Sequence, residues 1–369
     1  MIKFILRIIL RIFPKKISKI IKSEYHQFIR DKSTPRWNRD PNYVTSREIK
    51  IGFVGAGNYA KHHLLSLKKI QGVSLDCILT NTGRNSAKIV EDYGFKESFT
   101  DIKEFMKREV DAYFVVSASD TLFKISKELF SLGKPILIEK PPGYTSSQTK
   151  ELSELAKKNN TFGMVALNRR FYSDIQHGLA MLANHSPIRG AILEVPENIS
   201  NARNANKLNE TEYKNYFYRN SIHAFDMLRH IMGEVVQLKS LGFSNNKNNN
   251  RALSAGAIVE HQKNRYSVIT TLWDTNPFYW RMKIIGERGY LEFSEKEVTK
   301  FFDAKMRLYN IYTDEVDLKF RKGNLMQTIS FIKSVDKNII PKLPSSDLED
   351  AYKTMQFMEL YENYRYDEN

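Results

Sequence analysis

Apolar runs alternate with helical patterns between residues 50 and 165. The run IKIGFV leads into an amphipathic stretch, the run VSLDCILT follows it, and VDAYFVV and KPILIE each lead into a further helical pattern. Strands that alternate with helices in this way form a parallel sheet covered by helices. The sequence therefore predicts an α/β domain of the Rossmann type, with a parallel sheet, over residues 50–165.

Residues 166–369 show a different pattern. Several runs, among them IRGAILEV and YSVITTLWD, alternate in the manner of strands, and turns rich in Asn, Gly and Lys separate them. Two later stretches, 323–335 and 345–365, carry apolar residues at helical spacing. We therefore expect an α+β domain over 166–369, with an open, mainly antiparallel sheet that can cover a cleft with one face.

The first 49 residues stand apart from both domains. Basic residues recur every four positions beside Ile, Leu and Phe: Lys3, Arg7, Arg11, Lys15 and Lys19. A helix over 1–22 would thus be amphipathic, but its charges and Pro14 interrupt the apolar run too early for a membrane span. Two interpretations remain, a helix on an anionic membrane surface and an arm that packs on the protein or a neighbouring subunit. Residues 31–49 are typical of a linker.

Charge and composition narrow the class of partner. Residues 1–49 hold 12 Lys/Arg and four Asp/Glu, a net charge of +8 within a total of +15, which favours anionic partners. Nucleic-acid binding is disfavoured because no aromatic platform interleaves with the basic residues. The eight histidines and one cysteine never fall into metal-ligand spacing, so no metal is predicted. The single Cys77, in an apolar run, indicates the cytoplasm, at the inner face of the membrane if the N-terminal helix binds lipid.

A glycine-rich turn follows the first apolar run in GFVGAGNYA. Gly55 permits the tight turn, Gly57 lets the backbone approach a pyrophosphate, and Ala60 lets the helix pack closely on the strand. The phosphates would lie at the positive end of that helix. The strand, turn and helix therefore predict a dinucleotide site, with Asn58 and Tyr59 as neighbouring contacts.

The end of the second run bears on the choice between NAD and NADP. An acidic residue that binds the adenosine ribose is usual there, but the chain reads Thr80, Asn81, Thr82, Gly83, Arg84. Hydroxyl groups and Arg84 could receive a 2′-phosphate instead, while Asp76 within the strand is a poor substitute. The sequence thus favours NADP over NAD.

Ligands of parallel sheets bind at the carboxyl ends of the strands. The residues expected there are Ser117, Ala118, Glu139, Lys140 and Pro141. This places one lysine near the nicotinamide.

Four motifs occur together from residue 50 onward: GFVGAGNYA, EKPP at 139–142, LNRRF at 167–171 and IHAFDMLRHIMG at 222–233. In their order and spacing the chain resembles the glucose–fructose oxidoreductase/inositol dehydrogenase/MocA family. The resemblance implies hydride transfer between NAD(P) and a hydroxyl carbon of a sugar, nucleotide sugar or polyol. It also implies a homo-oligomer built through the open sheet face. The stretch TNTGRNSA looks like part of oxidoreductases associated with bacterial surface polysaccharide synthesis.

The resemblance nominates two catalytic residues. It implies that Lys140 contacts nicotinamide and substrate and that His223 assists proton transfer. The chemistry agrees, because alcohol oxidation needs a group that takes the hydroxyl proton, and an ammonium stabilises developing negative charge. It also places Asn168, with Arg169 or Arg170, in the cleft, where guanidinium groups can bind a carboxylate or phosphate.

One position departs from the family pattern. Members typically carry an aspartate four residues before the histidine, but this chain has Arg219, followed by Asn220. We expect this pair to contact the substrate, with Arg219 binding an anionic group. Because a carboxylate raises the basicity of histidine, its loss also allows a second hypothesis. In that hypothesis the chain is a catalytically degraded relative that serves as a membrane-tethered binding or scaffold protein.

Overall fold

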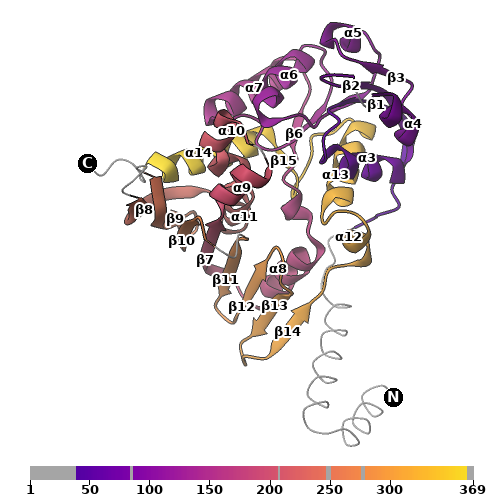
Figure 1. Ribbon diagram of the computed structural model, residues 1–369. Helices are drawn as coiled ribbons and strands as arrows, with labels where there is room; N and C mark the ends of the chain where they lie inside the picture. The colour runs from indigo at the N-terminus through magenta and orange to yellow at the C-terminus, as the bar shows by residue number, and fades with distance from the viewer. Residues whose placement is uncertain (1–38, 84–85, 207, 247–250, 276–278, 364–369) are drawn as a thin grey trace, which may run out of the picture.

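Two sheets organise the chain, as Figure 1 shows. The structure is a computed structural model, and it describes residues 39–363 apart from 84–85, 207, 247–250 and 276–278. The helix predicted over residues 1–22 and the predicted cofactor contact Arg84 lie outside the described residues. Within the described part of the chain, no helix has the length and apolar character needed to cross a bilayer.

The first sheet is of the Rossmann type, with strands in the order β15-β6-β5-β4-β1-β2-β3. All its neighbouring pairs are parallel except β15 with β6. The α/β domain predicted from the alternation of strands and helices is confirmed. The strands are β1 (Val44–Val54), β2 (Gln71–Leu79), β3 (Glu97–Phe99), β4 (Ala112–Val115), β5 (Ile136–Ile138), β6 (Gly163–Val165) and β15 (Ser346–Asp347).

Helices cover both faces of this sheet. The helices of the first domain are α3 (Ala60–Lys69), α4 (Ser86–Tyr93), α5 (Ile102–Met106), α6 (Ser119–Phe130) and α7 (Ser146–Lys158). Alternate residues of β1 enter different cores: Phe53 packs with α3, whereas Val54 lies in the cluster that includes α6 and α7. A strand with both faces buried is apolar along its length, which explains the continuous apolar runs in the sequence.

The C-terminal part of the chain returns to the first domain. Helix α13 (Asn324–Asp336) packs on α3 and β1, and its Phe331 ring meets Phe114 edge to face with centroids 5.2 Å apart. Strand β15 adds to the sheet through pairing of Ser346 with Val165. The second domain therefore does not run unbroken from 166 to 369, as the sequence predicted, because α13 buries its apolar face against the parallel sheet.

The start of the folded body also lies earlier than predicted. Strand β1 begins at Val44, within the stretch interpreted as a linker. Before it, the Arg39 guanidinium makes ion pairs of 2.9 Å with Asp314 and 3.1 Å with Asp317. The described residues 39–49 thus pack against the C-terminal half of the chain, through contacts that no local pattern encodes.

The second sheet has eight strands in the order β14-β13-β12-β11-β7-β10-β9-β8. Only β7 and β10 pair in parallel, so the mainly antiparallel sheet is confirmed. The strands are β7 (Ile188–Glu197), β8 (Val235–Asn246), β9 (Arg251–His261), β10 (Arg265–Trp273), β11 (Arg281–Gly286), β12 (Gly289–Ser294), β13 (Thr299–Asp303) and β14 (Leu308–Ile311).

In the part of the chain that the structure describes, helices cover one face of the second sheet. Helix α11 packs on β7, and α8 packs on β12 and β13. Along β7 the inward residues Ala191, Leu193 and Val195 are buried, whereas the outward Ile192 and Glu194 are exposed. The remaining elements are η1 (Asn168–Phe171), α8 (Ser173–His185), α9 (Ile199–Asn206), α10 (Glu210–Lys214), η2 (Phe217–Ser221), α11 (Ile222–Met232), α12 (Glu315–Lys319) and α14 (Leu348–Asn363).

Candidate active site

The turn between β1 and α3 has the shape of a dinucleotide cradle. Gly55 has a φ of +105°, and a Cβ there would lie 2.1 Å from the Val116 carbonyl oxygen, so only glycine fits. At Gly57 a Cβ would meet nothing within 4 Å, so the backbone faces open space. The first turn of α3 holds no acidic residue. The turn thus fits a dinucleotide, whose pyrophosphate would lie against Gly57 and the positive end of α3.

The other residues of the motif surround this cradle. Ala60 is buried, which lets α3 lie close to the sheet, while Asn58 is exposed. Tyr59 is 46% exposed and contacts Arg321, which precedes α13. The Arg321 guanidinium lies 4.4 Å from the centre of the Tyr59 ring and donates a 2.8 Å hydrogen bond to the Tyr59 hydroxyl. Arg321, far away in sequence, therefore brings a positive charge to the turn.

The described residues at the end of β2, 80–83, offer no free carboxylate. Thr80 is buried and its Oγ1 has no hydrogen-bond partner, whereas Asn81 is exposed. The carboxylate of Asp76, within the strand, pairs with Arg108 at 3.0 Å and with Lys96 at 3.2 Å. Asp76 is thus engaged elsewhere, and the Thr80 hydroxyl at the strand end has unused hydrogen-bonding capacity.

Two strand ends place the residues expected near the nicotinamide. Ser117 follows β4, and Ala118 is the residue before α6. Glu139, Lys140 and Pro141 follow β5. These residues lie at the same sheet edge as the glycine turn, because β4 neighbours both β1 and β5. The structure therefore brings these predicted contacts to one edge of the sheet.

Glu139 is fixed by a histidine from α3. Its Oε1 lies 2.8 Å from Nε2 of the buried His63, and its Oε2 accepts a 3.1 Å hydrogen bond from the Lys140 backbone N–H. Burial alone would raise the pKa of the Glu139 carboxyl, but the hydrogen bond and charge of His63 and the charge of Lys140 hold that pKa below its usual value. Glu139 thus remains ionised beside Lys140.

Lys140 reaches across to the second domain. Its Nζ donates a 2.9 Å hydrogen bond to the backbone carbonyl oxygen of Arg219, in η2. Burial lowers the pKa of the Lys140 ammonium to about 8, against the charge of Glu139 and together with the repulsion of Arg169 and nearby guanidinium groups. An amine with this pKa can release and take up a proton near neutral pH.

His223 lies in the first turn of α11 and is buried. Its Nδ1 has no hydrogen-bond partner. Burial holds the pKa of the imidazole well below its usual value, and the charges of Arg169 and Lys140 act in the same direction. The imidazole is therefore neutral at pH 7.

The two adjacent arginines have different surroundings. Arg169 pairs with Glu295 at 2.8 Å and lies over the Trp280 ring, while its buried Nη1 has no hydrogen-bond partner. The Arg170 side chain is fully buried, with contacts of 2.5 Å to Asp226 and 2.6 Å to Asp350. The Arg170 guanidinium thus holds α11 and α14 together, and a contact of Arg170 with substrate stays a prediction.

Asn168 and Arg219 are also engaged within the chain. Asn168 Nδ2 donates a 2.8 Å hydrogen bond to the Lys322 carbonyl oxygen, and Arg219 Nη1 pairs with Glu212 at 2.7 Å. In this arrangement the Arg219 side chain is turned toward α10, and its backbone carbonyl is what meets Lys140. Its role as an anion-binding residue stays a prediction.

The sequence interpretation missed Glu197, at the end of β7. This buried carboxyl accepts hydrogen bonds from the Asn220 side chain and from the Ser221 hydroxyl. Burial raises its pKa to about 7, although Asn220 and Ser221, with the charges of Arg169 and Lys140, oppose that rise. A signal was available, since the inward alternation of Ala191, Leu193 and Val195 continues to Glu197.

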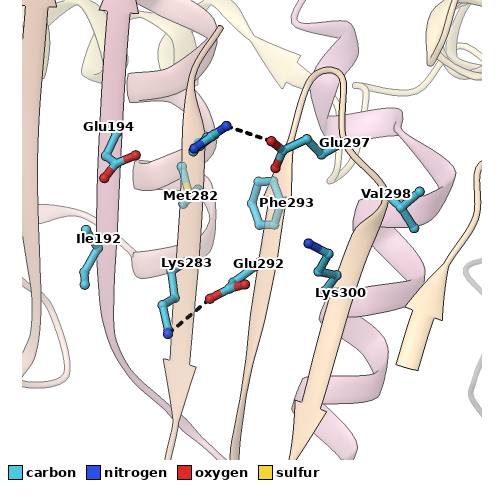
Figure 2. Close-up of a pocket in the computed structure, with 10 residues that line it drawn as sticks. Ile192, Glu194, Met282, Lys283, Glu292, Phe293, Glu297, Val298 and Lys300 are labelled. Carbon is cyan, nitrogen blue, oxygen red and sulfur yellow. Dashed lines mark hydrogen bonds and ion pairs between the residues drawn. The ribbon is translucent and has the colours of Figure 1, made fainter. Parts of the chain in front are cut away.

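A separate pocket of about 460 Å³ lies on the open face of the second sheet (Figure 2). Its lining includes two charge pairs, Lys283 with Glu292 at 3.1 Å and Arg281 with Glu297 at 2.7 Å. None of the lining residues belongs to the cradle or surrounds Lys140 and His223. The charged groups on this pocket already neutralise one another, so we place the chemistry at the sheet edge instead. Within the described residues, no group of three or more His, Cys, Asp or Glu side chains could hold a metal ion.

The cradle and the strand-end residues agree with a known family. Residues 49–167 match the family described as "Oxidoreductase family, NAD-binding Rossmann fold", which is the Gfo/Idh/MocA family. The match covers the Rossmann domain of this chain, residues 49–167. Among curated proteins, an uncharacterised oxidoreductase of Bacillus subtilis, YrbE, is 24% identical over 205 residues, which is 53% of this chain and 58% of that protein. The chain matches only 58% and 62% of the lengths of the first two such relatives.

Solved structures of dehydrogenases share the whole fold. The UDP-N-acetylglucosamine 3-dehydrogenase GnnA from Acidithiobacillus ferrooxidans has a TM-score of 0.70 at 15% identity, covering 86% of this chain and 98% of that chain. A levoglucosan dehydrogenase, solved in complex with NADH and levoglucosan, has a TM-score of 0.74 at 14% identity, covering 86% and 97%. At these identities the likeness establishes the fold alone, in which both domains of this chain are arranged as in those structures.

Proposed function

We propose that this protein transfers a hydride between a nicotinamide cofactor and a hydroxyl-bearing carbon of a sugar, nucleotide sugar or polyol. The observation that carries the proposal is the position of Lys140. Lys140 follows β5, which lies next to β4, and β4 lies next to the cradle strand β1. The Lys140 Nζ contacts the turn that precedes the His223 helix. A titratable amine thus lies against the turn that leads into the helix of a neutral imidazole, and the charge of that amine acts on the imidazole.

Lys140 and His223 suit the oxidation of an alcohol. The bound cofactor would supply the nicotinamide carbon that accepts the hydride from the substrate carbon. Lys140 Nζ, in its neutral form, takes the proton of the hydroxyl group, so that the C–O bond becomes a carbonyl as the hydride leaves. The neutral His223 orients that hydroxyl by a hydrogen bond. In the reverse direction the Lys140 ammonium returns the proton to the oxygen.

The class of substrate rests on two supports. Structural neighbours include dehydrogenases for UDP-N-acetylglucosamine and levoglucosan, and a curated relative is a myo-inositol 2-dehydrogenase. In this chain Arg169 Nη1 is buried without a hydrogen-bond partner. Such a donor gains most from an acceptor that a ligand brings, and a carboxylate or phosphate is the acceptor that guanidinium binds best. We therefore propose an acidic sugar or a nucleotide sugar as substrate.

The dinucleotide site is tested by replacing Gly57 with aspartate. Because a Cβ at Gly57 meets nothing within 4 Å, the apo protein should keep its unfolding midpoint. The new carboxylate would face the pyrophosphate, so the Kd for NADH and NADPH should rise about 100-fold or more, since like charges in contact cost several kcal/mol. Fluorescence titration of the full chain measures both values.

Gly55→Ala is the matched control for that experiment. A Cβ at Gly55 would overlap the Val116 carbonyl, so this variant should lower the unfolding midpoint, which Gly57→Asp should not. If the full-length Gly57→Asp variant binds both cofactors as tightly as the unmodified chain, the cradle is not the dinucleotide site. Absence of binding to the unmodified, folded chain would favour the scaffold hypothesis, in which the fold persists without catalysis.

The same titration decides the preferred cofactor. We propose NADP, because the described part of the β2 end offers the unpartnered Thr80 hydroxyl and no free carboxylate for the adenosine ribose. Tighter binding of NADPH than of NADH supports this preference, and the opposite ratio contradicts it. Structural neighbours solved with NAD⁺ or NADH show that the fold can bind a cofactor without the 2′-phosphate.

We further propose a homo-oligomer built through the open face of the second sheet. Three exposed apolar residues lie side by side on adjacent strands: Ile192 on β7, Val268 on β10 and Ile258 on β9. Val268→Glu should therefore convert the assembly to smaller species in light scattering coupled to size exclusion. Leu318→Glu, at a 74% exposed position in α12, should leave the mass unchanged. An unchanged mass for Val268→Glu would exclude this face.

The cellular setting follows as a proposal from the same features. A buried free thiol at Cys77 suits a reducing cytoplasm. A nucleotide-sugar substrate would agree with a role in cell-surface polysaccharide biosynthesis, and contact of residues 1–22 with an anionic membrane would place the enzyme near such products. Binding of the full chain to anionic and neutral vesicles tests the membrane contact.

A further inference from the structure

A buried carboxyl grips the turn that precedes the His223 helix. Glu197 is 4% exposed and lies at the end of β7. Its Oε1 accepts hydrogen bonds of 2.7 Å from Asn220 Nδ2 and 3.0 Å from Ser221 Oγ, and its Oε2 lies 2.6 Å from the same Asn220 nitrogen. Among the described residues, no cation makes an ion pair with Glu197. Its partners are therefore two neutral donors from one turn.

That turn has an unusual backbone. Residues 217–221 form a π-helix, a wide turn that is frequent at functional sites. The Arg219 carbonyl oxygen on this turn accepts the hydrogen bond from Lys140 Nζ. Lys140 from the first domain and Glu197 from the second thus contact three consecutive residues, 219–221. These residues lie directly before the turn of α11 that carries His223.

We propose that Glu197 is a positioning residue of the hydride-transfer site, whose negative charge and hydrogen bonds to residues 220–221 set the place and the proton affinity of Lys140. This inference rests on the proposed function, and it adds a residue that acts through Lys140. Removal of the Glu197 charge should change the pKa of the Lys140 amine even where the fold is intact. Loss of a residue with a purely structural role would leave that pKa unchanged.

Several charged and titratable groups face Glu197 from the elements around it. Lys140 from the end of β5 and Arg169 from η1 act on its charge, and Glu197 in turn acts on Tyr216 beside η2. Burial raises the pKa of Glu197 to about 7, close to the value of about 8 for Lys140. Above pH 7 the carboxylate accepts both hydrogen bonds and favours the ammonium form of Lys140. Below pH 7 it is protonated and that attraction is lost.

The test compares Glu197→Gln, Glu197→Asp and the control Glu287→Gln in the full chain. Glu287 pairs with Arg189 on the surface of the second sheet, so its loss removes an equal charge far from the turn. Reductive methylation with ¹³C-formaldehyde gives each lysine an NMR signal whose titration yields its pKa, and Lys140→Arg identifies the Lys140 signal. The second readout is the pH profile of kcat/KM for NAD(P)⁺ reduction with a panel of nucleotide sugars, sugar acids and inositols.

We expect Glu197→Gln to lower the pKa of Lys140 in the NMR titration by roughly one pH unit, because an attractive charge is lost. It should also remove the ionisation near pH 7 from the kcat/KM profile, while NADH binding is retained. Glu197→Asp should restore part of both, and it serves in place of the glutamine variant if that protein does not fold. Glu287→Gln should change neither.

Two outcomes separate the inference from the proposed function. If folded Glu197→Gln shows the Lys140 pKa and the pH profile of the unmodified chain, the positioning role of Glu197 is overturned and the oxidoreductase function stands. If the unmodified chain reduces no cofactor with any compound of the panel, the proposed function fails. A shifted Lys140 pKa in Glu197→Gln then still establishes the coupling of the two residues, because that measurement needs no turnover.

Discussion

Replacement of Lys140 by methionine is expected to lower kcat about 10³-fold, within the range that a positioned acid or base contributes. Methionine keeps most of the side-chain length but cannot take the hydroxyl proton or donate to the Arg219 carbonyl. The cradle around Gly57 does not involve Lys140, so the Kd for the cofactor should change little. Stopped-flow measurement of NAD(P)H formation, with a parallel binding titration, separates the two effects.

The pH dependence gives this prediction a sign. The pKa of Lys140 lies at about 8, and its neutral amine is the form that takes a proton. For substrate oxidation, kcat/KM of the unmodified enzyme should therefore rise with pH through about 8. For carbonyl reduction, which needs the ammonium form, it should fall over the same range. Lys140→Met should lose both limbs.

The control for Lys140→Met is Lys134→Met, at an exposed position before β5. This variant removes the same charge from the surface and should retain full activity. Turnover of Lys140→Met at the unmodified rate would remove the residue from the mechanism. Equal loss in both variants would indicate a general effect of charge.

Replacement of Arg170 by alanine is expected to lower the free energy of unfolding by about 3–5 kcal/mol, the cost of breaking a buried ion pair from one side. The guanidinium lies 2.5 Å from Asp226 on α11 and 2.6 Å from Asp350 on α14, with none of its surface exposed. Its removal would leave the carboxylates of Asp226 and Asp350 with less positive charge beside them. Asp226 also lies three residues after His223 on the same helix. Urea unfolding at pH 7 measures the loss.

The matched control is Arg189→Ala. Arg189 also pairs with a carboxylate, Glu287, but both side chains are largely exposed, at 59% and 40%. Such a surface pair contributes about 0–1 kcal/mol, so the control should unfold near the unmodified chain. If Arg170→Ala kept full stability and instead weakened substrate binding, the substrate role predicted for Arg170 from the sequence would be supported.

Arg170→Ala should also change how the free energy of unfolding falls at acidic pH. Burial opposes ionisation of Asp350, but Arg170 and Arg229 hold the pKa of its carboxyl well below the usual value. A carboxyl with a lowered pKa stabilises the fold above its unfolded-state pKa, and that contribution is lost as the pH falls toward the folded-state value. Arg170→Ala should raise this pKa, so part of the stability loss on acidification should disappear.

The sequence by itself determined the elements and the cofactor turn of this protein. Periods of two and of 3.6 residues, and the need for glycine at a φ of +105° in Gly55, are local properties that a short segment expresses wherever it lies. The motifs that contain Lys140 and His223 are also runs of residues adjacent in the chain, and the resemblance that nominates these two residues rests on them.

Only the tertiary structure decided how these segments meet. It brought α13 and β15 back to the first sheet, paired Arg170 with Asp226 and Asp350, and joined Glu197 to Asn220. Each of these contacts links residues distant in sequence, and each depends on which apolar faces pack together. A buried carboxyl gains its function from the donors and charges that surround it, and those surroundings exist only after the chain has folded.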